Sequence, residues 1–371
     1  NKDDYVASTW DNFAQALEAA KAVLDLDDAT QTEIEAAKEN LQKAMEALLS
    51  KTGWQVINGQ KYYYGEDGIK KTGWQEIDGK KYYFGEENDG AMKTYWQQID
   101  GKWYFFGNDG VMRTYWQKVW GKWYFLGNAS DGAMKTGWQK IWGKWYYLGS
   151  ANDGAMKTGW QQVYGKWYYL GSAEDGSMKT YWQQINGKWY FFGGADDGAM
   201  KTGWQKIWGK WYYLGSANDG AMKTGWQKVW GKWFYLAENG EMQTGWKKLS
   251  GKWYYLGGSN DGSMKYDWQK ISGRWYYLGG ADDGVMRTYW HQVRGKYYWL
   301  GSNGVMRTGW QNVYGKYYWL GGSNDGAMKT GWQKVGGKYY LLGKNGDMKS
   351  GWQTVYGKKY YLGGANDGSM K

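Results

Sequence analysis

The stretch TGWQKIWGKWYYLG at residues 136–149 decides the fold, because near-copies of it recur along most of the chain. We number each copy from its first tryptophan, here Trp138, as position 0. Positions +4 and +5 are then Trp142 and Gly143, and an x-Gly pair between two runs of β-forming residues is typical of a two-residue hairpin turn. This turn predicts antiparallel pairing of +3 with +6, +2 with +7, +1 with +8, and 0 with +9.

Fifteen such repeats follow one another, in steps of 20 or 22 residues. Their first tryptophans are Trp54, Trp74, Trp96, Trp116, Trp138, Trp160, Trp182, Trp204, Trp226, Trp246, Trp268, Trp290, Trp310, Trp332 and Trp352. The two-residue difference lies between the aromatic block and the next Met, so we expect a loop to absorb it. A repeat this short cannot bury a core alone and must stack on its neighbours. The sequence therefore predicts a mainly β fold, a β-hairpin solenoid forming a superhelix of about fifteen repeats.

Cross-strand partners share one face of a hairpin, which divides each repeat into two sides. Positions 0, +2, +7 and +9 carry aromatic rings beside a polar residue, as in Trp138, Lys140, Trp145 and Tyr147. That side suits a half-open aromatic surface. The other side carries the aliphatic residue at +3 and the aromatic residue at +8, and we expect it to pack on the neighbouring hairpin.

The first fifty residues differ from the rest, since they contain no glycine and are rich in Ala, Leu, Glu and Lys. Apolar residues at helical spacing predict one helix over 9–24, and Thr30 followed by Glu33 forms a capping-box pattern that opens a second. We expect one face of this second helix to carry Ile34, Leu41, Met45 and Leu48. The sequence predicts a helical module at 1–50 and the repeats at 51–371.

This segment resembles the FIVAR module of bacterial surface proteins in its DY…TW start and its AT-Q-x-E-I-x-x-A-x-x-x-L second helix. The resemblance implies a partial module that lacks an earlier helix, with the role of a spacer. No signal peptide is visible, and we expect the chain to be a fragment of a longer protein. A catalytic domain could lie outside it.

Composition excludes several kinds of chemistry. The chain has no Cys, so it has no disulfide, thiolate metal site or Cys nucleophile. Its only histidine, His291, is expected to be a surface strand residue. The acidic residues recur at Asp-Gly turns, where they have a conformational reason, so we expect no enzymatic activity, metal or cofactor in this fragment. A net charge of +11 favours polyanionic partners, or simply keeps an aromatic-rich surface soluble. No apolar run approaches the ~20 residues that span a bilayer.

Position +7 is the most informative of the repeat. It is Trp in nine consecutive repeats, from Trp103 to Trp275, then Tyr in three, and Lys at both ends of the array: Lys61, Lys81 and Lys359. A core position would not usually accept Lys, whereas a position lining an optional ligand site could. Several aromatic faces and a nearby Met make an electron-rich box. Such boxes bind quaternary ammonium groups by cation–π attraction of about 0.5–2 kcal/mol per ring.

The local pattern GW-x6-WYYL…G-x-M-x-TGW resembles the choline-binding repeats of Gram-positive surface proteins. In that family two tryptophans of one repeat and an aromatic residue of the next enclose the choline of teichoic acid. The resemblance implies the following ligand-binding residues in this chain. They are Trp96, Trp103, Tyr124, Trp116, Trp123, Tyr146, Trp138, Trp145, Tyr168, Trp160, Trp167, Tyr190, Trp182, Trp189, Tyr212, Trp204, Trp211, Trp226, Trp233, Tyr254, Trp246, Trp253, Tyr276, Trp268, Trp275 and Tyr298, with Met134, Met156, Met178, Met200 and Met222.

Two features point to sugars instead. The stretches at 73–84 and 351–362 resemble the repeats of clostridial toxins and glucan-binding enzymes, which recognise carbohydrate. Aromatic residues also occupy the exposed turn at +4. These are Trp120, Trp142, Tyr164, Trp208, Trp230, Tyr314 and Tyr356. They could stack on sugar rings, or contact hairpins one superhelical turn away.

Three functions follow from these patterns. The first is a non-catalytic, multivalent module that attaches a surface or secreted protein to choline-bearing cell-wall polymers outside the cell, where many weak sites give avidity. The second is a carbohydrate-binding, adhesin-type array for host glycans or α-glucans. The third is a rigid structural stalk.

Overall fold

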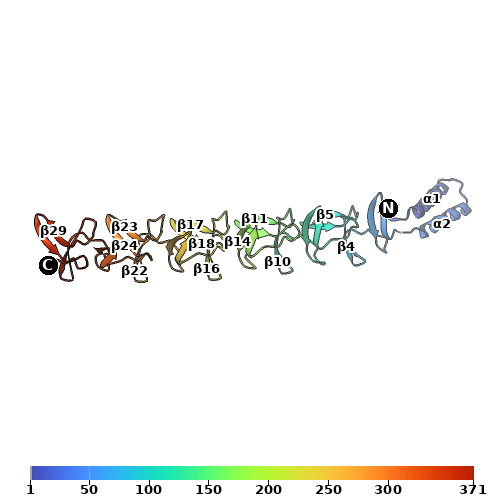
Figure 1. The fold of residues 1–371 in the computed structure, drawn as a ribbon. Coiled ribbons are helices and arrows are strands. Elements are labelled where there is room, and N and C mark those ends of the chain that lie inside the picture. Colours follow the sequence, from blue (N-terminus) through green and yellow to red (C-terminus); the bar gives the residue numbers. More distant parts are fainter. Residues whose placement is uncertain (1, 50) are drawn as a thin grey trace. The chain divides into compact units, whose positions relative to one another are not determined.

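The computed structural model describes residues 2–49 and 51–371, which form a short helical module followed by a succession of two-stranded antiparallel hairpins (Figure 1). The predicted mainly β hairpin fold is confirmed. Contacts group the chain into two compact parts. The first comprises residues 1–179 and 194–199, and the second comprises residues 180–193 and 200–371.

The helical module consists of a 3-10 turn (η1, Lys2–Asp4), α1 (Ala7–Leu24) and α2 (Gln31–Glu46). The capping box is confirmed, because the Glu33 N–H donates to the Thr30 hydroxyl while the Glu33 carboxylate accepts from the Thr30 N–H. The predicted second helix is too long, since α2 ends at Glu46 and Leu48 lies beyond it; on the predicted face, Ile34 and Met45 are exposed. Two helices leave one side without a covering element, so residues on that side stay in contact with solvent.

The hairpins have nearly uniform length. In the first part they are β1 (Gly53–Ile57) with β2 (Gln60–Tyr64), β3 (Gly73–Ile77) with β4 (Lys80–Phe84), β5 (Tyr95–Ile99) with β6 (Lys102–Phe106), β7 (Tyr115–Val119) with β8 (Lys122–Leu126), β9 (Gly137–Ile141) with β10 (Lys144–Leu148), and β11 (Gly159–Val163) with β12 (Lys166–Leu170). In the second part they are β13 (Tyr181–Ile185) with β14 (Lys188–Phe192), β15 (Gly203–Ile207) with β16 (Lys210–Leu214), β17 (Gly225–Val229) with β18 (Lys232–Leu236), β19 (Gly245–Leu249) with β20 (Lys252–Leu256), β21 (Trp268–Ile271) with β22 (Arg274–Tyr277), β23 (Tyr289–Val293) with β24 (Lys296–Leu300), β25 (Trp310–Val313) with β26 (Lys316–Trp319), β27 (Gly331–Val335) with β28 (Lys338–Leu342), and β29 (Gly351–Val355) with β30 (Lys358–Leu362).

The predicted register is confirmed. In the hairpin of β9 and β10, Ile141 pairs with Lys144 and Trp138 pairs with Tyr147. The turn residues have positive φ angles, 49° at Trp142 and 82° at Gly143. A two-residue turn that continues the twist of its strands requires positive φ at both positions. This conformation is uncommon for a residue with a bulky side chain, so the turn itself does not favour an aromatic residue at +4.

Each repeat contributes three side chains to the interior. Ile141 at +3 and Tyr146 at +8 are buried, as predicted, and Leu148 at +10 has no exposed surface at all. Position +10 was not singled out from the sequence, although it is aliphatic or aromatic throughout. It ends the second strand and faces the linker, where Leu148 forms a bridge with Met156.

Within each part, backbone hydrogen bonds join successive repeats. The N–H of Met242, in the linker after β18, donates to the carbonyl of Trp211 in β16 at 2.8 Å. The Met242 sulfur also lies against Gly262 of the following linker, where an added Cβ would come within 2.3 Å of it. The methionine therefore contacts both the preceding repeat and the following linker, as part of the stacking that a single hairpin lacks.

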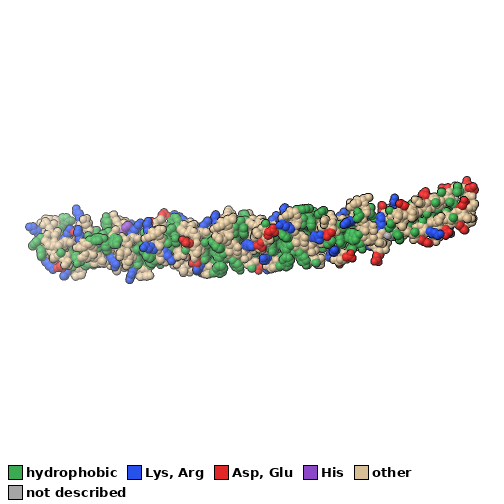
Figure 2. Space-filling model, turned by 45° about the vertical axis from the view of Figure 1, so that its right-hand side comes forward, with side chains coloured by type: hydrophobic (Ala, Val, Ile, Leu, Met, Phe, Trp, Pro, Cys, Tyr) green, Lys and Arg blue, Asp and Glu red, His purple; other side chains and the backbone are tan. Residues whose placement is uncertain are grey.

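Charge is unevenly distributed. Residues 1–50 contain 4 lysines and 11 acidic residues, whereas residues 51–371 contain 43 basic and 25 acidic residues. The repeats alone therefore carry +18. Figure 2 shows lysines and arginines between exposed hydrophobic side chains along the repeats. The positive charge belongs to the aromatic surface and not to the helices.

Candidate functional site

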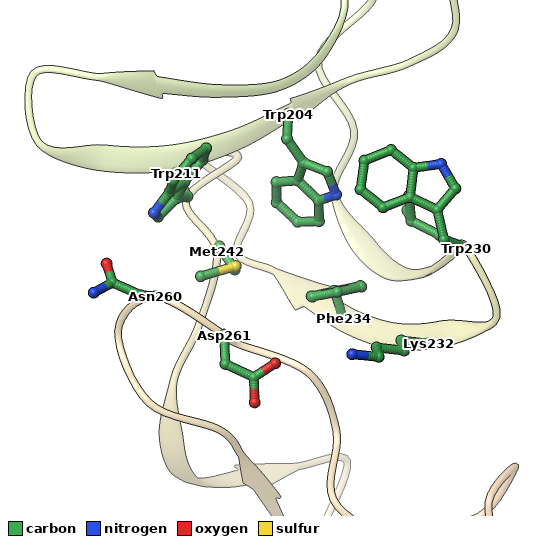
Figure 3. Close-up of a pocket in the computed structure, with 9 residues that line it drawn as sticks. Trp204, Trp211, Trp230, Lys232, Phe234, Met242, Asn260 and Asp261 are labelled. Carbon is green, nitrogen blue, oxygen red and sulfur yellow. The ribbon is translucent and has the colours of Figure 1, made fainter.

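A pocket of about 580 Å³ lies where three successive repeats of the second part meet (Figure 3). Trp204 on β15 and Trp211 on β16 come from the first repeat. Phe234 on β18 and the turn residue Trp230 come from the second. The floor and rim are completed by the linker residue Met242 and by Asn260 and Asp261, which precede Gly262 in the loop after β20.

The hairpin register explains how these rings meet. Positions 0 and +7 share a face, which places the ring centroids of Trp204 and Trp211 6.5 Å apart at an interplanar angle of 83°. Phe234, at +8 of the next repeat, packs on Trp204 with its centroid at 4.8 Å. The three rings line adjoining sides of the pocket. Their electron-rich faces can surround a cation.

The same arrangement recurs along the array. The ring centroids at positions 0 and +7 lie 6.3–6.5 Å apart in the pairs Trp96–Trp103, Trp116–Trp123, Trp138–Trp145, Trp160–Trp167, Trp182–Trp189, Trp204–Trp211, Trp226–Trp233 and Trp246–Trp253. Position 0 contacts +8 of the next repeat at 4.8–5.1 Å in Trp96–Tyr124, Trp116–Tyr146, Trp138–Tyr168, Trp182–Tyr212, Trp226–Tyr254, Trp246–Tyr276 and Trp268–Tyr298. The structure thus brings most of the predicted aromatic residues together. Phe234 supplies the third ring for Trp204 and Trp211, for which the prediction named none. In the set of Trp160, Trp167 and Tyr190 the two tryptophans are paired, and the contribution of Tyr190 stays a prediction.

The contact between position 0 and the next +8 does not depend on a cage. It is present as Trp54–Tyr82 at 5.0 Å and Trp74–Tyr104 at 4.9 Å, in repeats whose +7 residue is lysine. Positions 0 and +8 are therefore part of the scaffold, and +7 is the wall that varies.

Lysine at +7 changes the character of the pocket. The pocket beside Trp74 is smaller, about 350 Å³, and is lined by Lys81 where Trp211 stands in its counterpart. The Lys81 ammonium donates to the carbonyl of Ser130 at 3.1 Å. A fixed positive charge at this wall repels a cationic ligand.

A feature that sequence analysis missed is the role of the long loops. Ser130 belongs to the loop two repeats after Lys81, and Asn260 belongs to the loop two repeats after Trp211. We call the residue directly before the Asp-Gly pair of a long loop the cover residue. Asn152 has the same place in the pocket of Trp96 and Trp103, which also holds Met134.

The two-residue difference in repeat length decides whether position +7 is covered. Where the loop two repeats later is short, the +7 ring is exposed: 42% for Trp189, 42% for Trp253 and 45% for Tyr297. Where that loop is long, the ring is partly buried, as for Trp211 and Tyr317. The sequence predicted only that the loops accommodate the difference in repeat length. In the structure, loop length also controls the exposure of the +7 ring two repeats upstream.

Three cover residues are acidic and bind the ring that they cover. Glu174 accepts from Trp123 Nε1 at 3.0 Å, and its other oxygen accepts from Lys118 at 2.8 Å. Asp196 accepts from both Trp145 Nε1 and Lys140 at 3.0 Å.

The third is Asp282, which accepts from Trp233 Nε1 at 3.1 Å and from Lys228 at 2.9 Å. In each case the lysine stands at +2, directly across the hairpin from the tryptophan. Hydrogen bonds from the Trp145 indole and the Lys140 ammonium lower the pKa of Asp196. Hydrogen bonds from Lys118 and then Trp123 lower the pKa of Glu174 in the same way.

The aromatic turn residues have two surroundings. Trp120 and Trp230 line the pockets of the preceding repeat. Trp142 lies edge-on to Phe125 at 6.4 Å, and Tyr314 to Trp299 at 5.9 Å, again in the preceding hairpin. These four rings face aromatic side chains of the preceding hairpin, and not of one a superhelical turn away. All of the aromatic turn residues remain largely exposed, from 74% to 99%.

His291 lies on β23, half-buried against Tyr277, with ring centroids 5.4 Å apart. Burial, and secondly the charge of Arg287, lower the pKa of this histidine. Over residues 2–49 and 51–371, no group of three or more His, Asp or Glu side chains is arranged to hold a metal ion. None of the described helices is both long and apolar enough to cross a membrane.

Comparison with known families matches the helical module and most of the repeats. Residues 51–96, 93–136, 135–181, 179–224 and 223–264 match the choline-binding repeat. Residues 267–286, 288–306, 330–348 and 350–370 match a family described as "Putative cell wall binding repeat". Residues 1–49 match the FIVAR domain. A comparison with curated protein sequences finds no match.

Solved structures from Streptococcus pneumoniae show the same fold. The chain is similar to CbpJ at 32% identity and a TM-score of 0.53, over 69% of this chain and 100% of that one. It is similar to choline binding protein F at 35% identity and a TM-score of 0.51, over 69% of this chain and 98% of that one. The latter protein has also been solved in the presence of a peptidoglycan analogue, a tetrasaccharide-pentapeptide, with the same identity, coverage and TM-score.

Proposed function

The chain belongs to the choline-binding repeat family, and we propose that its repeats are a non-catalytic, multivalent module that holds a bacterial surface or secreted protein on choline-bearing cell-wall polymers. The ligand group is a quaternary ammonium, enclosed by positions 0 and +7 of one repeat and +8 of the next. The sites are those at Trp96–Trp275 where +7 is tryptophan. The helical module at 1–50 serves as a spacer.

One observation carries this proposal, namely the independence of the +7 wall from the scaffold. Trp74 and Trp204 make the same contact with +8 of the next repeat, yet one faces Lys81 and the other Trp211. A residue at +7 that only stabilised the stack should stay the same wherever the stacking contact stays the same. A quaternary ammonium cannot donate a hydrogen bond, so aromatic faces and a methionine are the surroundings that recognise it best.

Charge and repetition support a polymeric ligand. The repeats carry +18 while the helices are acidic, which draws a phosphate-bearing polymer to the repeats. Each cage alone is weak, because it offers only a few ring contacts. Many cages on one chain convert later binding events into intramolecular ones, and avidity rises without new contacts.

Choline titration of the whole chain tests the proposal. We expect millimolar choline to raise the melting temperature, because a ligand that binds only the folded state stabilises it by mass action. Trp211→Ala should remove one site from the calorimetric stoichiometry. Leu236→Ala, in the neighbouring core, serves as a control for general destabilisation. No shift in melting temperature with choline would contradict the proposal.

A second function, carbohydrate binding, is favoured by the aromatic turn residues. Trp142 has a φ of 49° and is 74% exposed, so neither the turn nor the core requires an indole there. Flat exposed rings suit stacking on sugar faces. A glycan array run with excess choline separates the two functions, since binding that survives choline and is lost in Trp142→Ala belongs to the turns.

A further inference from the structure

The lysines at +2 divide the covered cages into two kinds. In three of them, the lysine and the indole N–H of the +7 tryptophan share one carboxylate: Glu174, Asp196 or Asp282. In two others, those of Trp211 and Trp275, the cover residue is an asparagine, Asn260 or Asn324. The donors are the same in both kinds, but the acidic acceptor is present in only one.

The donor pair keeps its position without the carboxylate. Lys140 Nζ lies 5.7 Å from the centroid of the Trp145 ring, and Lys228 Nζ lies 5.4 Å from that of Trp233. Lys206 Nζ lies 6.0 Å from the Trp211 centroid, and the pair of Lys270 and Trp275 has the same distance. The hairpin register, and not the carboxylate, holds each lysine beside its indole.

The donors at the asparagine sites lack an acceptor. Nε1 of Trp211 and Nε1 of Trp275 are buried and have no hydrogen-bond partner among residues 2–49 and 51–371. Within the same residues neither Lys206 nor Lys270 forms an ion pair. A buried N–H without a partner costs roughly 1–3 kcal/mol, and it lies beside a cation. Figure 3 shows the ring nitrogen of Trp211 on the side of Asn260, at the edge of the pocket.

We propose that Lys206 with Trp211 Nε1, and Lys270 with Trp275 Nε1, form anion subsites attached to the cages. Each would take the phosphate, or another anionic oxygen group, of a ligand whose quaternary ammonium occupies the cage. Glu174, Asp196 and Asp282 show where that anion sits, because their carboxylates already occupy the equivalent place in the sister sites.

One side chain joins the two subsites. The face of Trp211 lines the cage, and its N–H edge faces the anion position, so a ligand with its two charges a few atoms apart can reach both. Charge-assisted hydrogen bonds from an ammonium and an indole are stronger than neutral ones. In the sister sites the protein's own carboxylate repels a second anion. The array therefore has cages that favour a zwitterionic ligand and cages that favour a plain cation.

This inference rests on the proposed function, and calorimetry of the whole chain with choline and with phosphocholine tests both. For the double variant Lys206→Gln, Lys270→Gln, we expect phosphocholine to bind about tenfold more weakly at two sites, with choline unchanged. The matched control is Lys334→Gln, because Lys334 Nζ lies 5.4 Å from the ring centroid of Tyr339, and a tyrosine has no indole N–H to complete the donor pair. That variant should leave both titrations unchanged.

A second pair of variants moves the carboxylate. Asn260→Asp with Asn324→Asp should weaken phosphocholine at the same two sites, whereas Asp196→Asn should create a further phosphocholine-preferring site beside Lys140. Equal effects on the binding of choline and of phosphocholine, or no effect of any of these changes on phosphocholine binding, would overturn the anion subsites. Such a result would not contradict the proposed cation cages. Failure of both ligands to bind the unmodified chain would overturn the proposed function as well.

Discussion

The repeats at Trp74 and Trp204 have the same scaffold and different pockets. Both have a two-residue turn, a fully buried residue at +10, and a position 0 ring packed on the next +8. They differ at +7, where Lys81 binds a loop carbonyl and Trp211 completes an aromatic wall. The stack is thus maintained by one set of positions while another set is free to define ligand sites.

The largest expected effect falls on what the two repeats share. Phe84 and Leu214, both at +10, have no exposed surface. We expect Phe84→Ala to lower the free energy of unfolding by about 3–5 kcal/mol and Leu214→Ala by about 2–5 kcal/mol, in urea denaturation. Trp230→Ala, at an exposed turn, should change it by less than about 0.5 kcal/mol. A small loss from either +10 variant would refute a shared core.

The contacts of the linker methionines with the following linker should show the next largest effect. An added Cβ at Gly262 would meet the sulfur of Met242 at 2.3 Å, whereas one at Gly258 would meet nothing within 4 Å. Gly262 also has a φ of 60°. Gly262→Ala should therefore cost about 1–3 kcal/mol, because a side chain is strained at this positive φ and the Met242 side chain must also shift, and Gly258→Ala should cost much less. Thermal melts of the two variants, side by side, measure the difference.

Exchange of the +7 wall should move a ligand site without unfolding the stack. Lys81→Trp should add a choline site beside Trp74, with a gain of about 0.5–2 kcal/mol from the new ring. Trp211→Lys should remove one site. The number of bound choline molecules, from calorimetry, checks both. If Lys81→Trp adds no site, the difference between the two repeats lies elsewhere than at +7.

The smallest expected effect is a pH dependence at the acid-covered cages. Hydrogen bonds lower the pKa of Asp196 in the folded state. The stability contributed by its ionised carboxylate is therefore fully present above the unfolded-state pKa of about 3.9, and it is lost as the pH falls through the lower folded-state pKa. The indole N–H resonance of Trp145 should therefore stay constant from about pH 5 to 8 and move only below the ordinary aspartate range. In Asp196→Asn it should not titrate. A midpoint above the ordinary aspartate pKa would contradict the hydrogen bonds.

Much of this could be predicted from the sequence, because the repeat fixes its own geometry. The Gly at +5 sets the turn, the turn sets the register, and the register places Trp138 and Trp145 on one face. The interior role of +3 and +8 follows from the same alternation. Position +10 escaped notice because it follows the aromatic block, where its burial depends on the linker folding back over it.

The cover residues could not be predicted in the same way. Glu174 lies 51 residues from the tryptophan it binds, and no local pairing rule connects positions two repeats apart. A signal was nevertheless present in the alternation of 20- and 22-residue steps. It could be interpreted only once the stack showed which upstream ring each long loop reaches.

The central claim is that the aromatic wall at +7, and not the hairpin itself, makes a ligand site. The most direct test is the stoichiometry of choline binding to the unmodified chain, measured by calorimetry. Tryptophan occupies +7 in nine of the fifteen repeats and tyrosine in three more. The account predicts about nine bound choline molecules, or twelve if the tyrosines also serve. A stoichiometry near the number of hairpins, or no binding at all, would contradict it.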